Sequence, residues 1–410
     1  MLQFLRAEPK LPSFIAIRAA DEVGSQMLNV AIGWYVYAAT RNPMSLAYVG
    51  LAQFVPNVGM VLIAGHVADR FDRAKVIRIS FLVQTICVGI FGAWVASRVP
   101  SVGPVYLLLF VMGSARSLCF PAMAALLPNL VKSENFPRGV AISSSIIQIC
   151  AIAGPAVGGL IYAVNGPAVF VVVSCLYLFA TVSTRWLSGA ARPAEEMQSP
   201  ISEKSVLAGV RYVRAHRLLL GLISLDLFAV LLGGVTALLP IYARDILIVG
   251  PIGLGWLRAA PGVGAAVIGL VLAHRTIEHN AGKRMLACVA GFGVATAVFA
   301  ISKNMWLSLA ALMGAGGFDM VSVVIRQTLL QTSTPDNMRG RVSAVSWVFI
   351  GASSELGEFE SGATAALFGT VPAALIGGLG TLVVVALWAV IFPELRGTDE
   401  LAAPETSRDA

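Results

Sequence analysis

Charged side chains are scarce in this chain. They make up only 12% of its 410 residues, whereas soluble domains carry roughly 25%. Hydrophobic residues make up 57%, and the mean hydropathy is +0.80. This balance excludes a soluble enzyme with a large core and indicates an integral membrane protein. The formal net charge of +7 does not point to nucleic acid, because the basic residues are scattered over short loops and form no stripe.

Cysteine and histidine are also few, which excludes several chemistries. Each of the five cysteines stands alone in an apolar run, so we expect no disulfide framework. The four histidines lie in or beside polar loops, and we expect neither a metal site nor a cofactor. The sequence has no nucleophile–base pattern and no glycine-rich phosphate loop ending in Lys-Ser/Thr. We therefore predict that the protein is not an enzyme and does not use ATP.

Long apolar runs are abundant instead. Each is near the roughly 20 residues that a helix needs to cross a bilayer, and signals for β-structure are absent, so we predict transmembrane helices. The twelve predicted spans are 14–38, 44–66, 75–97, 102–126, 138–164, 166–187, 218–243, 252–274, 283–302, 305–330, 341–369 and 371–392.

The distribution of basic residues predicts the orientation. Residues 1–13 are polar and precede an apolar run without a small-residue cleavage site, so we expect a retained cytoplasmic N-terminus. Of the 29 Lys and Arg residues, four then fall in outer loops and four within helices, which leaves 21 on the inner side. This asymmetry predicts a multi-pass protein with both termini in the cytoplasm.

The chain divides into two similar halves. We predict six-helix bundles over 1–187 and 218–396, a cytoplasmic linker over 188–217 and a cytoplasmic tail over 397–410. At a shift of 205, Pro56 falls on Pro261 and Gly50 on Gly255. Such repeats predict pseudo-symmetric bundles with a substrate site near the midplane. The linker holds either a surface helix around Val206–Arg217 or a solvated tether.

The polar segment between the second and third spans runs from Gly65 to Lys75 and reads GHVADRFDRAK. The pattern G-x-x-A-D-R-x-x-R-x-K resembles the loop between helices 2 and 3 of the major facilitator superfamily of secondary transporters. The loop 334–342 resembles the 10–11 turn of the same superfamily. The resemblance implies a cytoplasmic gate of charged side chains that pair and separate during transport. Its candidate residues are Gly65, Asp69, Arg70, Arg73, Lys75, Asp336, Arg339 and Arg341.

The fifth span contains Gly154, Pro155, Gly158 and Gly159 in the order G-P-x-x-G-G. This segment resembles the antiporter signature of exporters in the superfamily, although Cys150 stands where the signature usually has glycine. Glycines at this spacing let a neighbouring helix approach closely. A tight packing seam without bearing on transport direction is the alternative interpretation.

The eleventh span carries Glu355, Glu358 and Glu360, although carboxylates are costly in hydrocarbon. Glu355 and Glu358 share one helical face with Gly362. Two acids at close range repel, which favours a proton on one of them. We therefore predict that Glu355 or Glu358 carries the proton in a proton-coupled cycle. Structural acids near a wet helix end are the alternative.

Other polar residues lie within predicted spans. The further candidates for proton coupling are Asp21, Glu22, Asp226 and Asp319. The candidates for the cavity or the substrate are Arg116, Gln26, Asn29, Trp34, Gln53 and Arg326. In the superfamily helices 1, 4, 7 and 10 line the central cavity, and most of these residues fall on them. Structural salt bridges are the alternative for each charged residue.

The pairing of Gln26–Tyr37 with Gln53–Pro56, together with Phe120-Pro121-Ala122, resembles the branch that contains the enterobactin exporter and macrolide efflux pumps. The resemblance implies a monomeric proton antiporter of the bacterial inner membrane that exports a siderophore- or drug-like molecule. An importer or facilitator of a metabolite is the alternative within the fold. A membrane receptor without transport activity is less favoured, because no sizeable soluble domain is present.

Overall fold

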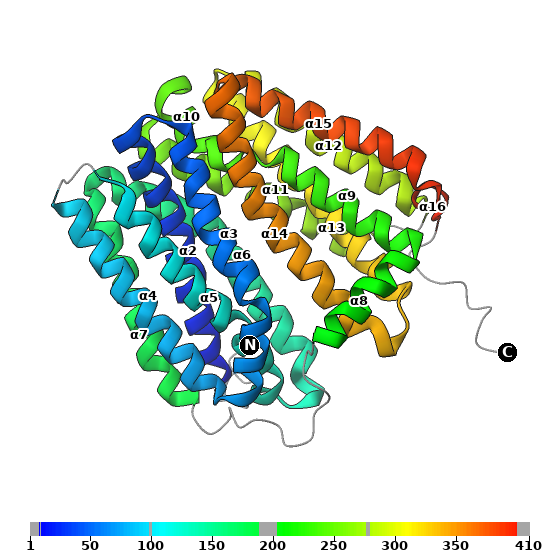
Figure 1. The fold of residues 1–410 in the computed structure, drawn as a ribbon, viewed down its shortest axis with the longest axis horizontal. Coiled ribbons are helices and arrows are strands. Elements are labelled where there is room, and N and C mark those ends of the chain that lie inside the picture. Colours follow the sequence, from blue (N-terminus) through cyan, green and yellow to red (C-terminus); the bar gives the residue numbers. More distant parts are fainter. Residues whose placement is uncertain (1–7, 9, 98–100, 188–202, 276–278, 400–410) are drawn as a thin grey trace. The chain divides into compact units, whose positions relative to one another are not determined.

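The computed structural model describes residue 8 and residues 10–97, 101–187, 203–275 and 279–399. Within these ranges, the side chains of 61–66, 68–70, 133, 203–207 and 337 lie outside the description. All regular elements in the described ranges are helical (Figure 1). The protein is therefore all-α, as its apolar runs of bilayer length predict.

The chain forms two compact units. The first comprises Met1–Ile201 and Leu239–Ala259, and the second comprises Ser202–Leu238 and Ala260–Ala410. The boundaries lie inside the seventh and eighth predicted spans, so Leu239–Ala259 packs with the first unit. This division differs from the predicted bundles at that segment, and the functional division of the chain stays a prediction.

The first unit is built from six long helices. They are α2 (Leu11–Thr40), α3 (Pro43–Arg70), α4 (Arg73–Ala96), α5 (Gly103–Leu130), α6 (Phe136–Val164) and α7 (Gly166–Ser183). Short turns η1 (Ser133–Asn135) and η2 (Thr184–Leu187) flank α6 and α7. The segment from the second half of the chain adds α10 (Leu239–Ile241), the π-helix η4 (Tyr242–Ile246) and the start of α11 (Gly250–His274).

The second unit contains the remaining helices. They are α8 (Glu203–Ala215), α9 (Arg217–Gly233), η3 (Val235–Leu238), the rest of α11, α12 (Ala281–Ile301), α13 (Met305–Thr332), α14 (Asp336–Phe368), α15 (Thr370–Ile391) and α16 (Pro393–Gly397). Nine helical segments among the described residues are long and apolar enough to cross a membrane. The other long helices, α2, α3 and α14, have 28 to 33 residues and complete a pattern consistent with twelve spans.

The same pairs of helices pack in each unit. In the first unit α2 packs on α6 and α7, and α4 packs on α5 and α7. In the second unit α9 packs on α14 and α15, and α12 packs on α13 and α15. These pairs correspond one to one when the six helices of each half are numbered in chain order. The internal sequence repeat is therefore also a repeat of packing, as expected for tandem six-helix bundles.

Polar residues in the short turns start several helices. The side chain of Asn42 accepts a hydrogen bond from the Met44 amide at 3.0 Å, and that of Asn304 accepts one from the Trp306 amide at 2.8 Å. Asp72 accepts one from the Lys75 amide at 3.1 Å at the start of α4. Each bond satisfies an amide that has no partner inside the helix.

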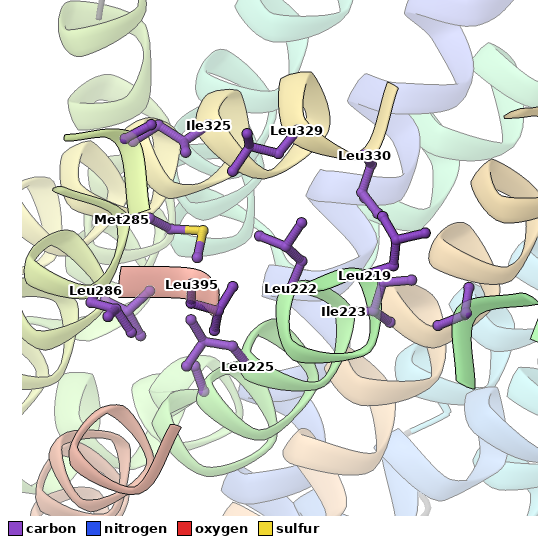
Figure 2. Packing of buried hydrophobic residues seen from close by; sticks show 14 of the residues in the cluster. Leu219, Leu222, Ile223, Leu225, Met285, Leu286, Ile325, Leu329, Leu330 and Leu395 are labelled. Atoms are coloured by element: carbon purple, nitrogen blue, oxygen red, sulfur yellow. The ribbon is translucent and has the colours of Figure 1, made fainter. Parts of the chain in front are cut away.

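A core of leucine, isoleucine, valine and methionine side chains holds the second unit together. Figure 2 shows Leu222, Met285 and Leu329 in this cluster, which joins α9, α12 and α13. Amphipathic α8 contributes Val213, which is 4% exposed, while Arg211 and Arg214 stay exposed. The surface helix predicted around Val206–Arg217 therefore exists and is docked on the bundle.

The seventh predicted span is not one continuous helix. Helix α9 ends at Gly233, and the 3₁₀ turn η3 follows before α10 and the π-helix η4. The hydroxyl of Ser361 on α14 donates a hydrogen bond to the Gly234 carbonyl oxygen at 2.8 Å. In lipid a broken helix requires such partners for its released backbone groups. The sequence predicted one continuous helix over 218–243, because the apolar run continues through the residues where the helix is interrupted.

Candidate functional site

A cluster of charged and polar side chains lies within the membrane-spanning part of the first unit. Asp21 on α2 interacts electrostatically with Arg116 on α5 and with Arg18 and Glu22 on its own helix. The Arg116 guanidinium also donates a hydrogen bond to the Ser25 hydroxyl. Two cations and two carboxylates thus compensate one another, as charges inside a membrane protein require.

The next turn of α2 extends this cluster. The Gln26 amide donates a hydrogen bond to Glu22 at 2.8 Å, so Gln26 rather than Arg18 is the close partner of this carboxylate. Asn29 is half-buried on the same helix, and Gln53 is half-buried on α3. The structure therefore brings Asp21, Glu22 and Gln26 of α2 together with Arg116 of α5, while Gln53 lies on α3.

The second unit holds a different arrangement. Arg326 on α13 forms an ion pair with Asp226 on α9, and these side chains are only 4% and 10% exposed. The pair joins the first and fourth helices of its bundle, as Arg116 and Asp21 do in the first unit. A buried charge of this kind needs its partner, because neither side chain has access to bulk water.

Asp319 lies on α13 two turns before Arg326. It makes neither a hydrogen bond nor an ion pair within the described part of the chain. Asp226 is neutralised by a fixed cation, whereas Asp319 has no comparable partner among these residues. The surroundings of the two carboxylates therefore differ, and the role of Asp319 in proton exchange stays a prediction.

Helix α14 carries the three predicted acids at half-buried positions. Glu355 and Glu358 both take part in interactions, and between them Gly357 packs on the backbone of α9, because a Cβ there would lie 3.0 Å from the Leu231 oxygen. The Glu360 carboxylate accepts a hydrogen bond from Thr364 at 2.8 Å. The acids therefore lie beside the helix that contains the break.

The polar turn before α14 is organised locally. Arg339 forms an ion pair with Asp336 at 2.8 Å and donates hydrogen bonds to the carbonyl oxygens of Gln331 at 3.2 Å and Thr334 at 3.5 Å. A cation at these carbonyl groups stabilises the C-terminal end of α13. Arg341 donates a hydrogen bond to the Met338 sulfur at 3.4 Å.

The polar segment between α3 and α4, which supplies the other predicted gate residues, is only partly described. The side chains of Gly65, Asp69 and Arg70 lie outside the described residues. Arg73 donates a hydrogen bond to the Ala125 carbonyl oxygen of α5 at 3.1 Å, and the exposed Lys75 supplies the backbone amide that Asp72 caps. The gating role of this loop stays a prediction.

Comparison with known proteins places these features in a family. The chain matches the family described as transmembrane secretion effector over residues 13–408. It belongs to this family of the major facilitator superfamily. The enterobactin exporter EntS of Shigella dysenteriae serotype 1 (strain Sd197) is 27% identical over 418 residues, which cover 100% of this chain and 98% of that protein. EntS of Escherichia coli O1:K1 / APEC gives the same values.

Solved structures agree on the fold. The nucleoside transporter NupG has a TM-score of 0.73 at 13% identity and covers 93% of this chain and 99% of its own. A bacterial homologue of the iron transporter ferroportin, solved in an inward-facing state, has a TM-score of 0.70 at 15% identity and covers 96% and 99%. The chain is thus a multi-pass membrane transporter of the major facilitator superfamily and not an enzyme.

In this family member the glycine-rich motif of α6 is a packing seam. A Cβ at Gly154 would lie 2.7 Å from the Gln26 Cβ, and one at Gly158 would lie 2.8 Å from the Met27 Cα. Gly159 faces α11, where a Cβ would lie 2.5 Å from the Pro251 oxygen. Pro155 is buried within α6, which continues from Phe136 to Val164. Close packing of this kind is expected from both interpretations of the motif, and its bearing on transport direction stays a prediction.

The sequence reading missed a second polar cluster in the first unit. The Tyr37 hydroxyl donates a hydrogen bond to Asp245, which also forms an ion pair with Arg41 at 3.0 Å. Next to it, the Arg244 guanidinium lies 5.6 Å from the ring centroid of Trp34, within cation–π range. At the repeat shift of 205 Tyr37 also falls on Tyr242 in this region, but no spacing rule connects Asp245 with α2.

Proposed function

We propose that this transporter exports a small organic molecule, siderophore- or drug-like, from the cytoplasm in exchange for protons. The observation that carries the proposal is the similarity to enterobactin exporters along the entire chain. The proposal includes a bacterial inner-membrane location, cytoplasmic termini and a monomeric working unit. The excess of basic residues in the loops on one side supports this orientation.

Proton coupling requires a carboxylate that binds and releases a proton within the membrane. Asp319 is the strongest candidate, since no fixed cation neutralises it within the described residues. Asp226 is less suited to this role, because Arg326 holds it in a buried pair. Glu355 and Glu358 remain candidates on α14, while Asp21 and Glu22 share a cluster with two arginines.

The polar cluster of α2 and α5 suits cargo recognition. Arg116 and Gln26 offer hydrogen-bond donors, and Glu22 offers an acceptor, on adjacent turns. Asn29, Trp34 and Gln53 are further candidates for contacts with a bulky ligand that combines apolar and polar groups, and pockets for such ligands use few polar side chains on largely apolar walls. Arg326 has its own fixed partner and is assigned a structural role.

The proposal is tested by measuring cargo-driven proton movement in proteoliposomes. Purified protein is reconstituted with a pH-sensitive dye inside the vesicles, and enterobactin is the first cargo, followed by a panel of lipophilic drugs. Addition of a true cargo shifts the internal pH in the direction expected for exchange, and an imposed proton gradient drives cargo accumulation. If cargo crosses the membrane and the internal pH does not change, the result would support a facilitator instead.

Asp319→Asn tests the coupling residue. This change keeps the size of the side chain but removes its ability to bind and release a proton. We therefore expect gradient-driven accumulation to be lost while cargo binding persists. Glu394→Gln is the matched control, because it also removes one carboxylate and Glu394 forms a partly exposed ion pair with Arg217 outside the candidate residues. Coupled transport that survives Asp319→Asn would remove this assignment, and the variant Glu355→Gln plus Glu358→Gln then tests α14.

A further inference from the structure

Helices α4 and α7 pack side by side in the first unit (Figure 1), and a cavity of about 260 Å³ lies between them. This cavity, here called the α4–α7 groove, is lined by residues from 85–93 of α4 and 170–178 of α7. None of the residues predicted for the substrate, proton coupling or the gate is among its lining residues. The groove is therefore separate from the polar cluster of α2 and α5.

The groove opens on an apolar outer face of the two helices. Leu82, Ile86 and Ile90 recur every four residues on α4 and are 44%, 54% and 50% exposed. Val171 and Leu178 of α7, which line the groove, are also exposed. Both helices are long and apolar enough to cross a membrane, and in the bilayer core no water reaches such a face. The groove therefore faces hydrocarbon.

Protein atoms leave one wall of the groove incomplete. A Cβ at Gly89 would meet only the Ser174 Oγ, at 3.9 Å, so no close helix contact requires glycine at this position. Glycine within a helix is less favourable than alanine, and here it gains no tight packing in return. The buried Ser174 hydroxyl also has no hydrogen-bond partner within the described part of the chain. Gly89 thus creates space between the helices.

The corresponding helix pair of the second unit is in close contact. There α12 packs on α15, and at the shift of 208 that places Lys75 on Lys283, Gly89 falls on Ala297. A Cβ at Gly378 of α15 would lie only 2.8 Å from the Ala297 nitrogen. An open seam is therefore not a requirement of the fold, and the groove is a property of α4 and α7.

The size of the groove limits what can occupy it. An apolar cavity of about 150 Å³ already binds benzene and stays free of water, and this one is larger. Its lining extends from Thr85 to Ala93, which is a rise of about 12 Å along α4. A helix of that length and a diameter of about 10 Å has a volume of roughly 900 Å³ and does not fit. A slender apolar chain parallel to the helices does fit, and an empty groove would forfeit dispersion contacts.

From these observations we propose that the α4–α7 groove binds one acyl chain of a membrane phospholipid. The chain lies along Gly89 and Gly92 and contacts Phe170 and Leu178. It completes the packing that protein atoms leave open, and it exchanges more slowly than the chains that cover the open apolar faces. The proposal is independent of the cargo, the direction of transport and the coupling ion.

The test maps where a lipid chain resides. Purified protein is placed in nanodiscs of phosphatidylethanolamine and phosphatidylglycerol, with a trace of a phosphatidylethanolamine that carries a photoreactive diazirine in one acyl chain. After irradiation, mass spectrometry counts the lipid adducts on each peptide. The reference is the exposed face of α15 around Val383 and Leu387. We expect adducts in 85–93 and 170–178 to exceed this reference by about threefold or more, because a groove gives the chain more contacts than an open face does.

Gly89→Leu places a side chain in the groove and should lower its adducts to the level of the α15 reference. Gly59→Leu is the matched control, because a Cβ at Gly59 of α3 meets nothing within 4 Å and the residue does not line the groove. This control should leave the groove adducts unchanged. Gly89→Ala adds only one methyl group at ordinary contact distance and should lower the adducts partially. The unfolding midpoint of each variant shows that it is folded.

Two results would overturn the proposal. One is a count of adducts in the groove that does not exceed the α15 reference, or that stays the same in both Gly89 variants. The other is a disulfide-linked dimer that forms through the exposed Cys175 when the other cysteines are replaced, because it would assign the groove to a second copy of the chain. Neither measurement uses cargo or a proton gradient, so a failed export assay would leave the lipid result standing.

Discussion

Loss of Arg326 should destabilise the second unit strongly. The side chains of Arg326 and Asp226 are 4% and 10% exposed, so Arg326→Met leaves a carboxylate without its cation in a dry environment. Removing one partner of a buried pair costs about 3–5 kcal/mol. The double variant Arg326→Met plus Asp226→Leu removes both charges, and replacement of a buried pair by apolar residues is often neutral or stabilising. We therefore expect the double variant to recover most of the lost stability.

The assay is a double-mutant cycle on the unfolding free energy in detergent, followed by tryptophan fluorescence. The matched comparison is Arg41→Met, since its pair with Asp245 is 57% and 36% exposed and should contribute only about 0–1 kcal/mol. If Arg326→Met changes stability no more than Arg41→Met does, the pair is not dry. If the two single changes add in the double variant, the residues are not coupled, and the reasoning fails.

Two further predictions concern packing and helix ends. Gly264→Ala should lower the unfolding midpoint measurably, because the added Cβ would lie 1.8 Å from the Met313 oxygen. The control Gly314→Ala meets nothing within 4 Å and should be neutral or slightly stabilising. Equal midpoints for the two variants would contradict the close approach of α11 and α13. Arg339→Ala should lower the free energy of unfolding by roughly 1 kcal/mol through the lost contacts at the end of α13, and Arg341→Ala should leave it almost unchanged. The same unfolding assay compares the two variants. Equal losses of stability would refute the capping role of Arg339.

The sequence predicted the class of the protein well. Apolar runs of bilayer length, the pattern from Gly65 to Lys75 and the repeat of Pro56 at Pro261 were sufficient for the fold and the superfamily. These features are local or periodic, and a bilayer imposes the same length and hydrogen-bonding demands on every crossing. The surface helix α8 could also be predicted from the sequence, because its apolar residues recur at helical spacing.

The pairing of charged side chains could not be predicted from the sequence. The sequence marked Asp226, Asp319 and Arg326 as costly in the membrane but did not show that Arg326 pairs with Asp226 and leaves Asp319 without a fixed cation in the described chain. Asp226 lies on α9, whereas Asp319 and Arg326 both lie on α13, far away in the sequence. Which carboxylate is neutralised depends on how two helices pack, and helical periodicity along one segment carries no such information.

The amino-acid sequence by itself determined that this chain is a helical membrane transporter with two related halves, because hydrophobicity and backbone hydrogen bonding in lipid act on each segment separately. Only the tertiary structure decided where the seventh span breaks and where Asp245 binds. The released Gly234 carbonyl is tolerated because Ser361, 127 residues away, donates to it, and Asp245 reaches Arg41 across 204 residues. Both depend on side chains that meet only when the helices have packed.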